Sequence, residues 1–276
     1  EKALEAGERS LAIARELDLR EQMAYTANDL CHVYNRTGQY GKSHEILEET
    51  RSVWRELGNL PMLADNLATA SYVHAFCGEY DAAAEYSQEA LRIGQSISNA
   101  WGCSYSQAMV GPMYFDRGNP DLAMETMKSS LSYAQEAGFV VALVYTRSNL
   151  GMVLAELGDT EQGIAAVQEA IQIARNGRLQ LLRYPLSQLA EVQMLAGNPD
   201  AAAAAIAEMK SHPGPFHMVQ PPVVTLAECR LALLQGDTTE SGRLLEQRLA
   251  DLRGYGMKAY IPETLYLLAQ ARREAG

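Results

Sequence analysis

Glycines recur along this chain at a nearly constant spacing, and that spacing restricts the fold more than any other feature. Seven of them follow apolar stretches of helical character and stand 39 or 40 residues apart, over the whole sequence. They are Gly38, Gly78, Gly118, Gly158, Gly197, Gly236 and Gly276. A fixed period of this length is typical of a solenoid built from one repeated supersecondary unit.

Small residues hold two further fixed positions in each period. Five residues after the glycine stand Ser43, Ala83, Ala123, Gly163, Ala202 and Ser241. Seven residues before it stand Cys31, Ser71, Gly111, Gly151, Ala190, Cys229 and Ala269. Small side chains on two facing helices let the helix axes approach closely, and a glycine accepts the left-handed conformation that ends the first helix. The sequence therefore predicts helical hairpins, in which segments such as "GNPD" and "GDTE" begin the second helix.

Composition supports a helical fold and excludes several functions. Hydrophobic residues make up 47% of the 276 residues, which is typical of a globular chain, and alanine and leucine favour helix. The net charge of −11 and the lack of a basic stripe argue against nucleic acid as a partner. No apolar run reaches the roughly 18 residues of a membrane span, so no membrane partner is expected. Four widely spaced cysteines predict reduced thiols in a cytoplasmic protein.

No motif for catalysis or for a cofactor is present. Residues 36–43, "RTGQYGKS", end like a phosphate-binding loop, but Arg36 stands where that loop needs its first glycine. G-x-S-x-G and H-E-x-x-H are absent. His32, His44 and His74 fall in different helical phases, which predicts no metal site. We therefore expect no enzyme activity, no cofactor and no metal.

The order of small residue, turn glycine and small residue resembles the tetratricopeptide repeat, most closely over residues 75–94 and 150–174. The resemblance implies an all-α, right-handed α-solenoid of about 14 helices that forms a single domain over residues 1–276. The period near 40 exceeds the family's usual length of about 34, so the helices should be longer. Six full repeats are expected at about 20–59, 60–99, 100–139, 140–178, 179–213 and 214–256, with half repeats at 2–17 and 258–275. Four prolines in residues 211–222 predict an interruption of helix there.

The half repeats at both ends and the missing initial Met predict a fragment of a longer multidomain protein. Arrays with this longer period resemble the C-terminal sensor repeats of the signal-transduction ATPases with numerous domains (STAND), such as maltose-type bacterial regulators and repeat-bearing cyclases. That resemblance implies a sensor domain that binds a small-molecule inducer or a protein or peptide in its superhelix. A further partner would be the rest of its own chain, including a nucleotide-binding switch. The alternative is a scaffold that holds a peptide or helix of another protein.

The resemblance also implies which side chains face the concave surface, counted back from each turn glycine. These candidate ligand contacts are Tyr25, Asn28, His32, Asp65, Tyr72, Tyr105, Tyr145, Ser148, Tyr184, Glu191 and Arg230. Tyrosines beside polar side chains suit a peptide, a sugar or a nucleobase, because tyrosine offers an apolar face and a polar tip. The same tyrosines could instead pack between adjacent repeats as part of the architecture. The sequence leaves both interpretations open.

Overall fold

The computed structural model describes residues 2–177, 181–212 and 221–275, and these contain helices and no strand. Fifteen α-helices and one short 3-10 helix, η1, follow one another in this part of the chain, which confirms the all-α solenoid. The helices are α1 (Lys2–Glu16), α2 (Arg20–Arg36), α3 (Tyr40–Leu57), α4 (Leu60–Phe76), α5 (Tyr80–Ser96), α6 (Ala100–Ala108), α7 (Val110–Asp116), α8 (Pro120–Ala137), α9 (Val140–Glu156), α10 (Thr160–Asn176), α11 (Arg183–Leu195), α12 (Pro199–Ser211), α13 (Pro221–Leu234), α14 (Thr238–Tyr255), η1 (Lys258–Tyr260) and α15 (Ile261–Ala275). None of these helices is long and apolar enough to cross a membrane.

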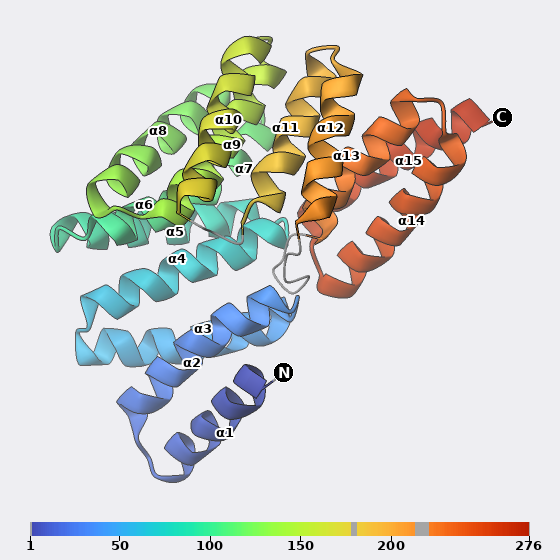
Figure 1. Ribbon diagram of the computed structural model, residues 1–276. Helices are drawn as coiled ribbons and strands as arrows, with labels where there is room; N and C mark the ends of the chain where they lie inside the picture. The colour runs from blue at the N-terminus through green and yellow to red at the C-terminus, as the bar shows by residue number, and fades with distance from the viewer. Residues whose placement is uncertain (1, 178–180, 213–220, 276) are drawn as a thin grey trace.

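The helices pack as antiparallel pairs that stack into an arc (Figure 1). Each first helix packs on the second helix of its own pair, as α2 does on α3 and α9 on α10. First helices of neighbouring pairs also contact one another, as α9 does α11 and α11 does α13. The first helices therefore form the inner, concave wall of the arc, and the second helices form its outer wall.

The turn between the two helices of a pair is closed by the periodic glycine, as the sequence predicted. At the fourth turn Gly158 has a φ of 98°, and its amide donates to the carbonyl of Ala155. The Asp159 side chain then accepts from the amide of Gln162 and caps α10. The five other described glycines of this phase also have φ values between 73° and 78°, and Gly276 lies outside the described residues.

The predicted small residues are the points where paired helices touch. A Cβ atom added to Gly151 or to Gly163 would lie 2.7 Å from the carbonyl oxygen of the other residue, so neither position admits a side chain without movement. In an earlier pair the Ser71 hydroxyl donates to the carbonyl of Ala83 at 2.8 Å. Backbone contact at the small residues therefore sets the distance between paired helices.

One first helix is interrupted, which the sequence analysis did not anticipate. The helix that follows Asn99 breaks at Met109 into α6 and α7. Pro112 explains the break, because it has no N–H to donate to the carbonyl of Ala108 and its ring crowds that oxygen. The break raises the number of α-helices from the expected 14 to 15.

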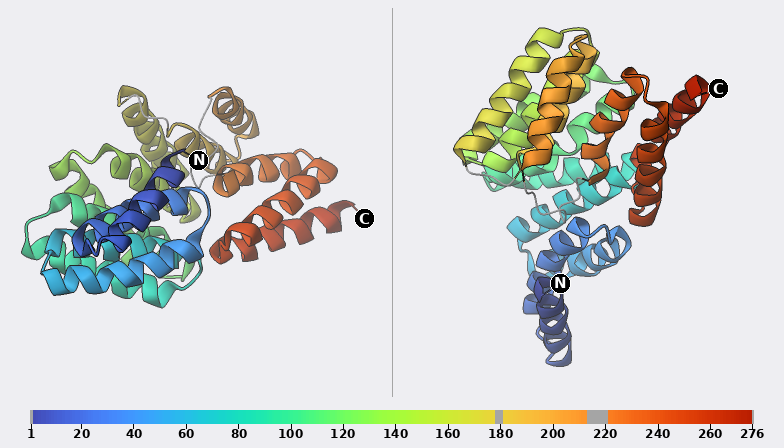
Figure 2. Two further views of the ribbon diagram at one scale, coloured as in Figure 1. Left: turned by 90° about the horizontal axis from the view of Figure 1, so that it is seen from below. Right: turned by 45° about the vertical axis from the view of Figure 1, so that its right-hand side comes forward.

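The C-terminal end of the arc returns to its N-terminal repeats, and this contact closes the groove on one side. Leu252 and Met257 are buried in one cluster with Tyr40 and Phe76. The rings of Phe76 and Tyr260 lie 5.6 Å apart. Views from two further directions show α14 beside the N-terminal helices (Figure 2). We call the packing of residues 252–261 on these N-terminal repeats the closing contact.

The interruption predicted at residues 211–222 falls partly on the described chain. Helix α12 ends at Ser211 and α13 begins at Pro221, so helix stops and restarts there. Residues 213–220 lie outside the described residues.

Candidate functional site

The predicted contact residues lie on the first helices, and most of them touch a residue of the next repeat. In the N-terminal part of the groove the Asn28 amide on α2 donates to Asp65 on α4 at 2.5 Å. The Tyr105 hydroxyl on α6 lies 3.4 Å from the Thr69 hydroxyl on α4. Burial raises the pKa of Asp65, although His32 acts to lower it. These contacts place Asn28, His32, Asp65 and Tyr105 in one row.

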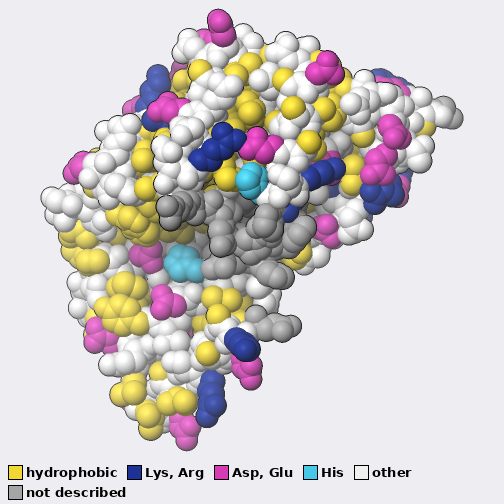
Figure 3. All heavy atoms as spheres, in the orientation of Figure 1, with side chains coloured by type: hydrophobic (Ala, Val, Ile, Leu, Met, Phe, Trp, Pro, Cys, Tyr) yellow, Lys and Arg dark blue, Asp and Glu magenta, His cyan; other side chains and the backbone are white. Residues whose placement is uncertain are grey.

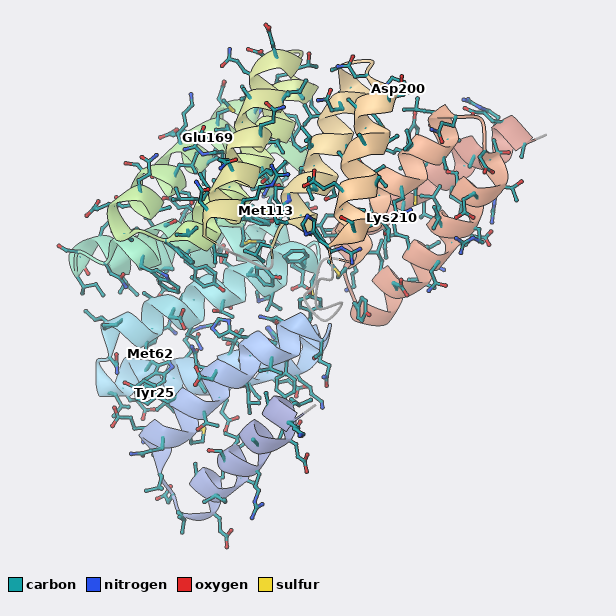
Figure 4. The ribbon with its side chains drawn as sticks, in the orientation of Figure 1. Tyr25, Met62, Met113, Glu169, Asp200 and Lys210 are labelled. Atoms are coloured by element: carbon teal, nitrogen blue, oxygen red, sulfur yellow. The ribbon has the colours of Figure 1, made fainter. Side chains whose placement is uncertain are left out.

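Tyr25 lies at the edge of this row and is 42% exposed. Its ring packs edge-on against Trp54, and its hydroxyl accepts from the Asn59 amide at 3.1 Å. Figure 4 labels Tyr25 and Met62 near one side of the N-terminal repeats, and Met113 near the middle of the arc.

Tyrosine rings form the middle of the groove. Tyr145 on α9 and Tyr184 on α11 stack with ring centroids 4.9 Å apart and planes 19° apart. The Tyr184 hydroxyl donates to Asn149, and burial raises the pKa of Tyr184 to about 12. Tyr72 on α4 lies 4.5 Å from the ring of Phe76. The predicted tyrosines Tyr145 and Tyr184 are thus in direct contact across two repeats, and Tyr72 packs on Phe76 of its own helix.

A pocket opens at the closing contact, between the tyrosines of the groove and α7. It is lined by Ala75, Phe76, Tyr80, Met109, Pro112, Met113, Asp116, Tyr145, Ala259 and Tyr260, and its cavity volume is about 30 Å³, which is room for a water molecule or two. Asp116 is exposed to solvent, although many protein atoms lie near its carboxyl group. Burial, together with the neighbouring carboxyl groups of Glu263 and Glu156, raises the pKa of its carboxyl group to about 7.

Carboxyl groups crowd around one arginine in the C-terminal part of the groove. Arg230 on α13 donates to Glu191 at 2.7 Å and to Glu263 at 2.5 Å. The Glu191 side chain is 5% exposed, and its burial raises the pKa to about 7 although Arg230 acts to lower it. Burial also raises the pKa of Glu156. A charged carboxylate is costly where protein replaces water, so these shifts indicate that Arg230 neutralises the cluster only in part.

Arg248 on α14 brings the second positive charge to this region. It is 1% exposed, and its Nε donates to the Thr264 hydroxyl at 2.9 Å. Within the described residues its two terminal nitrogens have no hydrogen-bond partner. The carboxyl groups of Glu156, Glu191 and Glu263 therefore share two arginines, and Asp116 lies near Glu156 and Glu263.

Several predicted residues are satisfied by the protein itself. Ser148 is fully buried and donates to the carbonyl of Val144 in its own helix, so its hydroxyl is not available to a ligand. Asn28 and Tyr184 are 2% and 5% exposed, and both form hydrogen bonds with residues of neighbouring repeats. Part of the predicted set is architectural, as the alternative interpretation held.

The sequence analysis missed Asp116 and Tyr260. Asp116 stands two residues before the turn glycine Gly118, and Phe76 and Glu156 occupy the same position in their repeats. The position of Asp116 in its repeat could therefore have identified it as a candidate. Tyr260 enters the pocket through the closing contact. No local pattern predicts that contact.

Two of the histidines that fall in different helical phases lie side by side in the structure. The rings of His44 on α3 and His74 on α4 lie 5.0 Å from centroid to centroid, nearly perpendicular. A helical phase describes a position on one helix only, whereas the packing of α3 on α4 brings these two faces together.

The visible face of the molecule carries mixed charge. Figure 3 shows basic and acidic side chains next to one another above the centre of this face, and hydrophobic side chains gathered over the N-terminal helices.

Comparisons with known families and structures agree with this fold. Two family models described as tetratricopeptide repeat match residues 22–96 and 184–208. A third, described as anaphase-promoting complex subunit 5, matches residues 112–194. These matches identify tetratricopeptide repeats over residues 22–96 and 184–208. No curated protein sequence matches it significantly.

Solved structures of similar shape extend over nearly the whole chain. One chain of the APC/C hetero-tetramer Cut9–Hcn1 matches with a TM-score of 0.64 and 18% identity, over 97% of this chain and 47% of that one. A Rap protein complexed with competence and sporulation factor matches with a TM-score of 0.61 and 13% identity, over 99% and 86%. A STAND protein with a tetratricopeptide repeat sensor from Pyrococcus horikoshii matches with a TM-score of 0.54 and 14% identity, over 96% and 44%. At these identities the likeness establishes the fold.

Proposed function

We propose that this chain is a sensor domain that binds a peptide carrying a lysine or arginine side chain in its concave groove. The observation that carries the proposal is the charge balance of the groove. Three carboxyl groups share two arginines beside the tyrosines, and the carboxyl group of Asp116 adds a further negative charge near Glu156 and Glu263. A ligand cation would supply the charge that the groove lacks.

The pocket at Asp116 has the chemistry of a cation site. Aromatic faces attract a cation by about 0.5 to 2 kcal/mol, and Phe76, Tyr145 and Tyr260 line this pocket together with the carboxyl group. The cavity of about 30 Å³ is smaller than a ligand pocket of about 300 Å³, so a long side chain would enter only if the closing contact moved apart. The remaining groove, from Asp65 to Glu191, would hold the rest of the peptide.

The closing contact links this pocket to the shape of the solenoid. Asp116 belongs to α7, whereas Tyr260 belongs to the C-terminal segment that packs on α4. An occupant that touches both favours one arrangement of the two ends, and a ligand shifts a conformational equilibrium by its differential affinity for the two states. This is the physical basis for a sensor that reports to a switch elsewhere in a larger STAND-type protein.

The likeness to a STAND sensor and to a Rap protein in complex with a factor supports this proposal. We further propose that the chain acts in the cytoplasm by binding alone, without catalysis. The scaffold is the second candidate, because mixed charge and hydrophobic patches also suit a protein partner. It differs in one respect: partner binding would leave the closing contact unchanged.

Fluorescence polarisation with a peptide array tests the binding step. Each peptide contains one Lys or Arg among apolar residues, and its matched control carries Glu or Gln instead. We expect basic peptides to bind, and Asp116→Asn to weaken them about tenfold, which corresponds to about 1.4 kcal/mol. Asp121→Asn, an exposed carboxylate on α8, is the matched control and should bind normally. Equal binding of basic and acidic peptides would overturn the proposal.

Small-angle scattering of the same complexes separates sensor from scaffold. A change in radius of gyration on binding supports the sensor, and an unchanged radius supports the scaffold. Binding of a free organic amine in place of every peptide would identify a small-molecule inducer.

A further inference from the structure

A second cluster of chemistry-bearing side chains lies apart from the pocket at Asp116. His44 and Glu48 stand one helical turn apart on α3, and His74 stands near the end of α4. One ligand atom from each lies within 4.8 Å of the other two. Two imidazoles and one carboxylate are a ligand set that divalent transition metals use in proteins.

The most telling member of the cluster is His74, which is 7% exposed. Its Nδ1 lies 2.6 Å from Oε2 of Glu79. When Nδ1 carries the proton and donates to Glu79, the lone pair is on Nε2. Among the described residues Nε2 is buried and has no hydrogen-bond partner. A buried, unpaired acceptor costs about 1 to 3 kcal/mol, and a metal ion would satisfy it.

The residues around the cluster support its ligands as they do in known metal sites. A metal-binding histidine commonly donates its other ring nitrogen to a carboxylate, which fixes the tautomer. Glu79 holds that place beside His74. Arg51 and Tyr86 both donate to Oε1 of Glu48, at 2.7 Å and 3.2 Å, and so orient the carboxylate with its other oxygen open to a metal.

We propose that His44, Glu48 and His74 bind a divalent transition-metal ion of the zinc class, with a water molecule as fourth ligand. Ligand atoms around a tetrahedral zinc ion stand about 3.3 Å apart, so the cluster must contract slightly. His74 is held in place, whereas His44 is half-buried and the Glu48 side chain is 45% exposed, so these two can rotate inward. Two imidazoles disfavour magnesium and calcium, which prefer oxygen ligands.

The ion would tie α3 of one repeat to α4 of the next. This inference is independent of the proposed peptide site, because none of its ligands lines the pocket at Asp116. Bound metal would stiffen the repeat junction beside the closing contact, since Tyr40 on α3 and Phe76 on α4 both belong to that contact.

Calorimetric titration of the metal-free chain with Zn²⁺ tests the site, with Co²⁺ as a spectroscopic probe. We expect one Zn²⁺ per chain, and tetrahedral Co²⁺ absorption without a thiolate charge-transfer band. His74→Gln and His44→Gln should each weaken Zn²⁺ binding more than about 100-fold. Glu79→Gln, which removes the orienting partner only, should weaken it about 10-fold to 100-fold.

His32→Gln is the matched control, because His32 is also half-buried on a neighbouring helix and lies outside the cluster. Its Zn²⁺ affinity should equal that of the wild type. The melting temperature of each metal-free variant shows whether it is folded, and His44→Gln keeps the test valid if His74→Gln is not. Absence of stoichiometric binding, normal binding by both ligand variants, or a thiolate band from a cysteine would overturn the proposal.

Discussion

The outer wall and the concave groove of this solenoid use charge in opposite ways. Between neighbouring repeats on the outside, each arginine meets one glutamate, and both side chains remain largely in water. These pairs are Arg15–Glu49, Arg55–Glu89 and Arg175–Glu208. In the groove, carboxyl groups outnumber arginines, and burial raises the pKa of Asp116, Glu156 and Glu191.

The outer charges are paired within the protein, whereas the groove has more carboxyl groups than arginines to pair with them. An exposed pair is complete in itself and contributes about 0 to 1 kcal/mol. Carboxyl groups with raised pKa values are destabilised as anions, and a cation from outside would lower their free energy. The groove is therefore the part of the molecule where a bound cation would stabilise the carboxylates.

The largest effect is expected from removing the cation at the centre of the groove. Arg230→Met leaves Glu191 and Glu263 without their shared partner, and loss of one member of a buried pair costs about 3 to 5 kcal/mol. Because Arg230 is partly exposed, the lower end of that range is expected for the free energy of unfolding in urea. Arg175→Met on the outer wall is the control and should cost less than about 1 kcal/mol. Equal losses would remove the distinction between the two walls.

The next effect is a dependence of stability on pH. The folded pKa of Glu191, about 7, exceeds the unfolded value near 4.3, so the folded state binds the extra proton between these values. Its contribution to stability is therefore fully present below about pH 4.3 and is lost as pH rises towards 7. Urea unfolding at pH 5 and pH 8 should show a smaller difference for Glu191→Gln than for the wild type. An unchanged difference would show that Glu191 titrates normally.

A third prediction concerns the closing contact that forms one side of the pocket. Gly38 and Gly118 have nearly equal φ values of 73° and 75°, so alanine strains both turns alike, by about 1 to 2 kcal/mol. A Cβ at Gly38 would lie 2.0 Å from the ring of Tyr255, whereas the space at Gly118 is open. Gly38→Ala should therefore be the less stable variant and should have a larger radius of gyration. Matching scattering curves for the two variants would contradict the closing contact.

The smallest effect is expected on the outer wall. A double-mutant cycle on Arg55 and Glu89, whose side chains are 53% and 33% exposed, should give a coupling below about 1 kcal/mol that vanishes in 1 M salt. A large, salt-resistant coupling would mean that the outer ion pairs stabilise the fold as much as the ion pairs of the groove do.

The parts of the structure that repeat could be predicted from the sequence. The phase of the glycines gave the turns, and the phase of the small residues gave contacts such as Gly151 with Gly163. The contacts that depend on the angles between helices could not be predicted from the sequence. The closing contact results from summed rotations of every pair, and the meeting of His44 and His74 depends on the crossing angle of α3 and α4. The helix break, by contrast, could have been predicted from Pro112.

The candidate site follows the same division. The tyrosines and the row from Asn28 to Arg230 were predictable because each member occupies a repeat position. Whether Ser148 or Tyr184 would be free for a ligand was not, because that depends on which neighbours accept their hydrogen bonds.

The central claim is that a ligand cation completes the carboxyl cluster of the groove. Calorimetric titration of the best basic peptide at pH 7, in two buffers of different ionisation enthalpy, measures the protons exchanged on binding. If a cation lowers the raised pKa values of Asp116 and Glu191, the complex releases protons, and this release disappears at pH 9 and is reduced in Asp116→Asn. Proton uptake, or no exchange at either pH, would contradict the account.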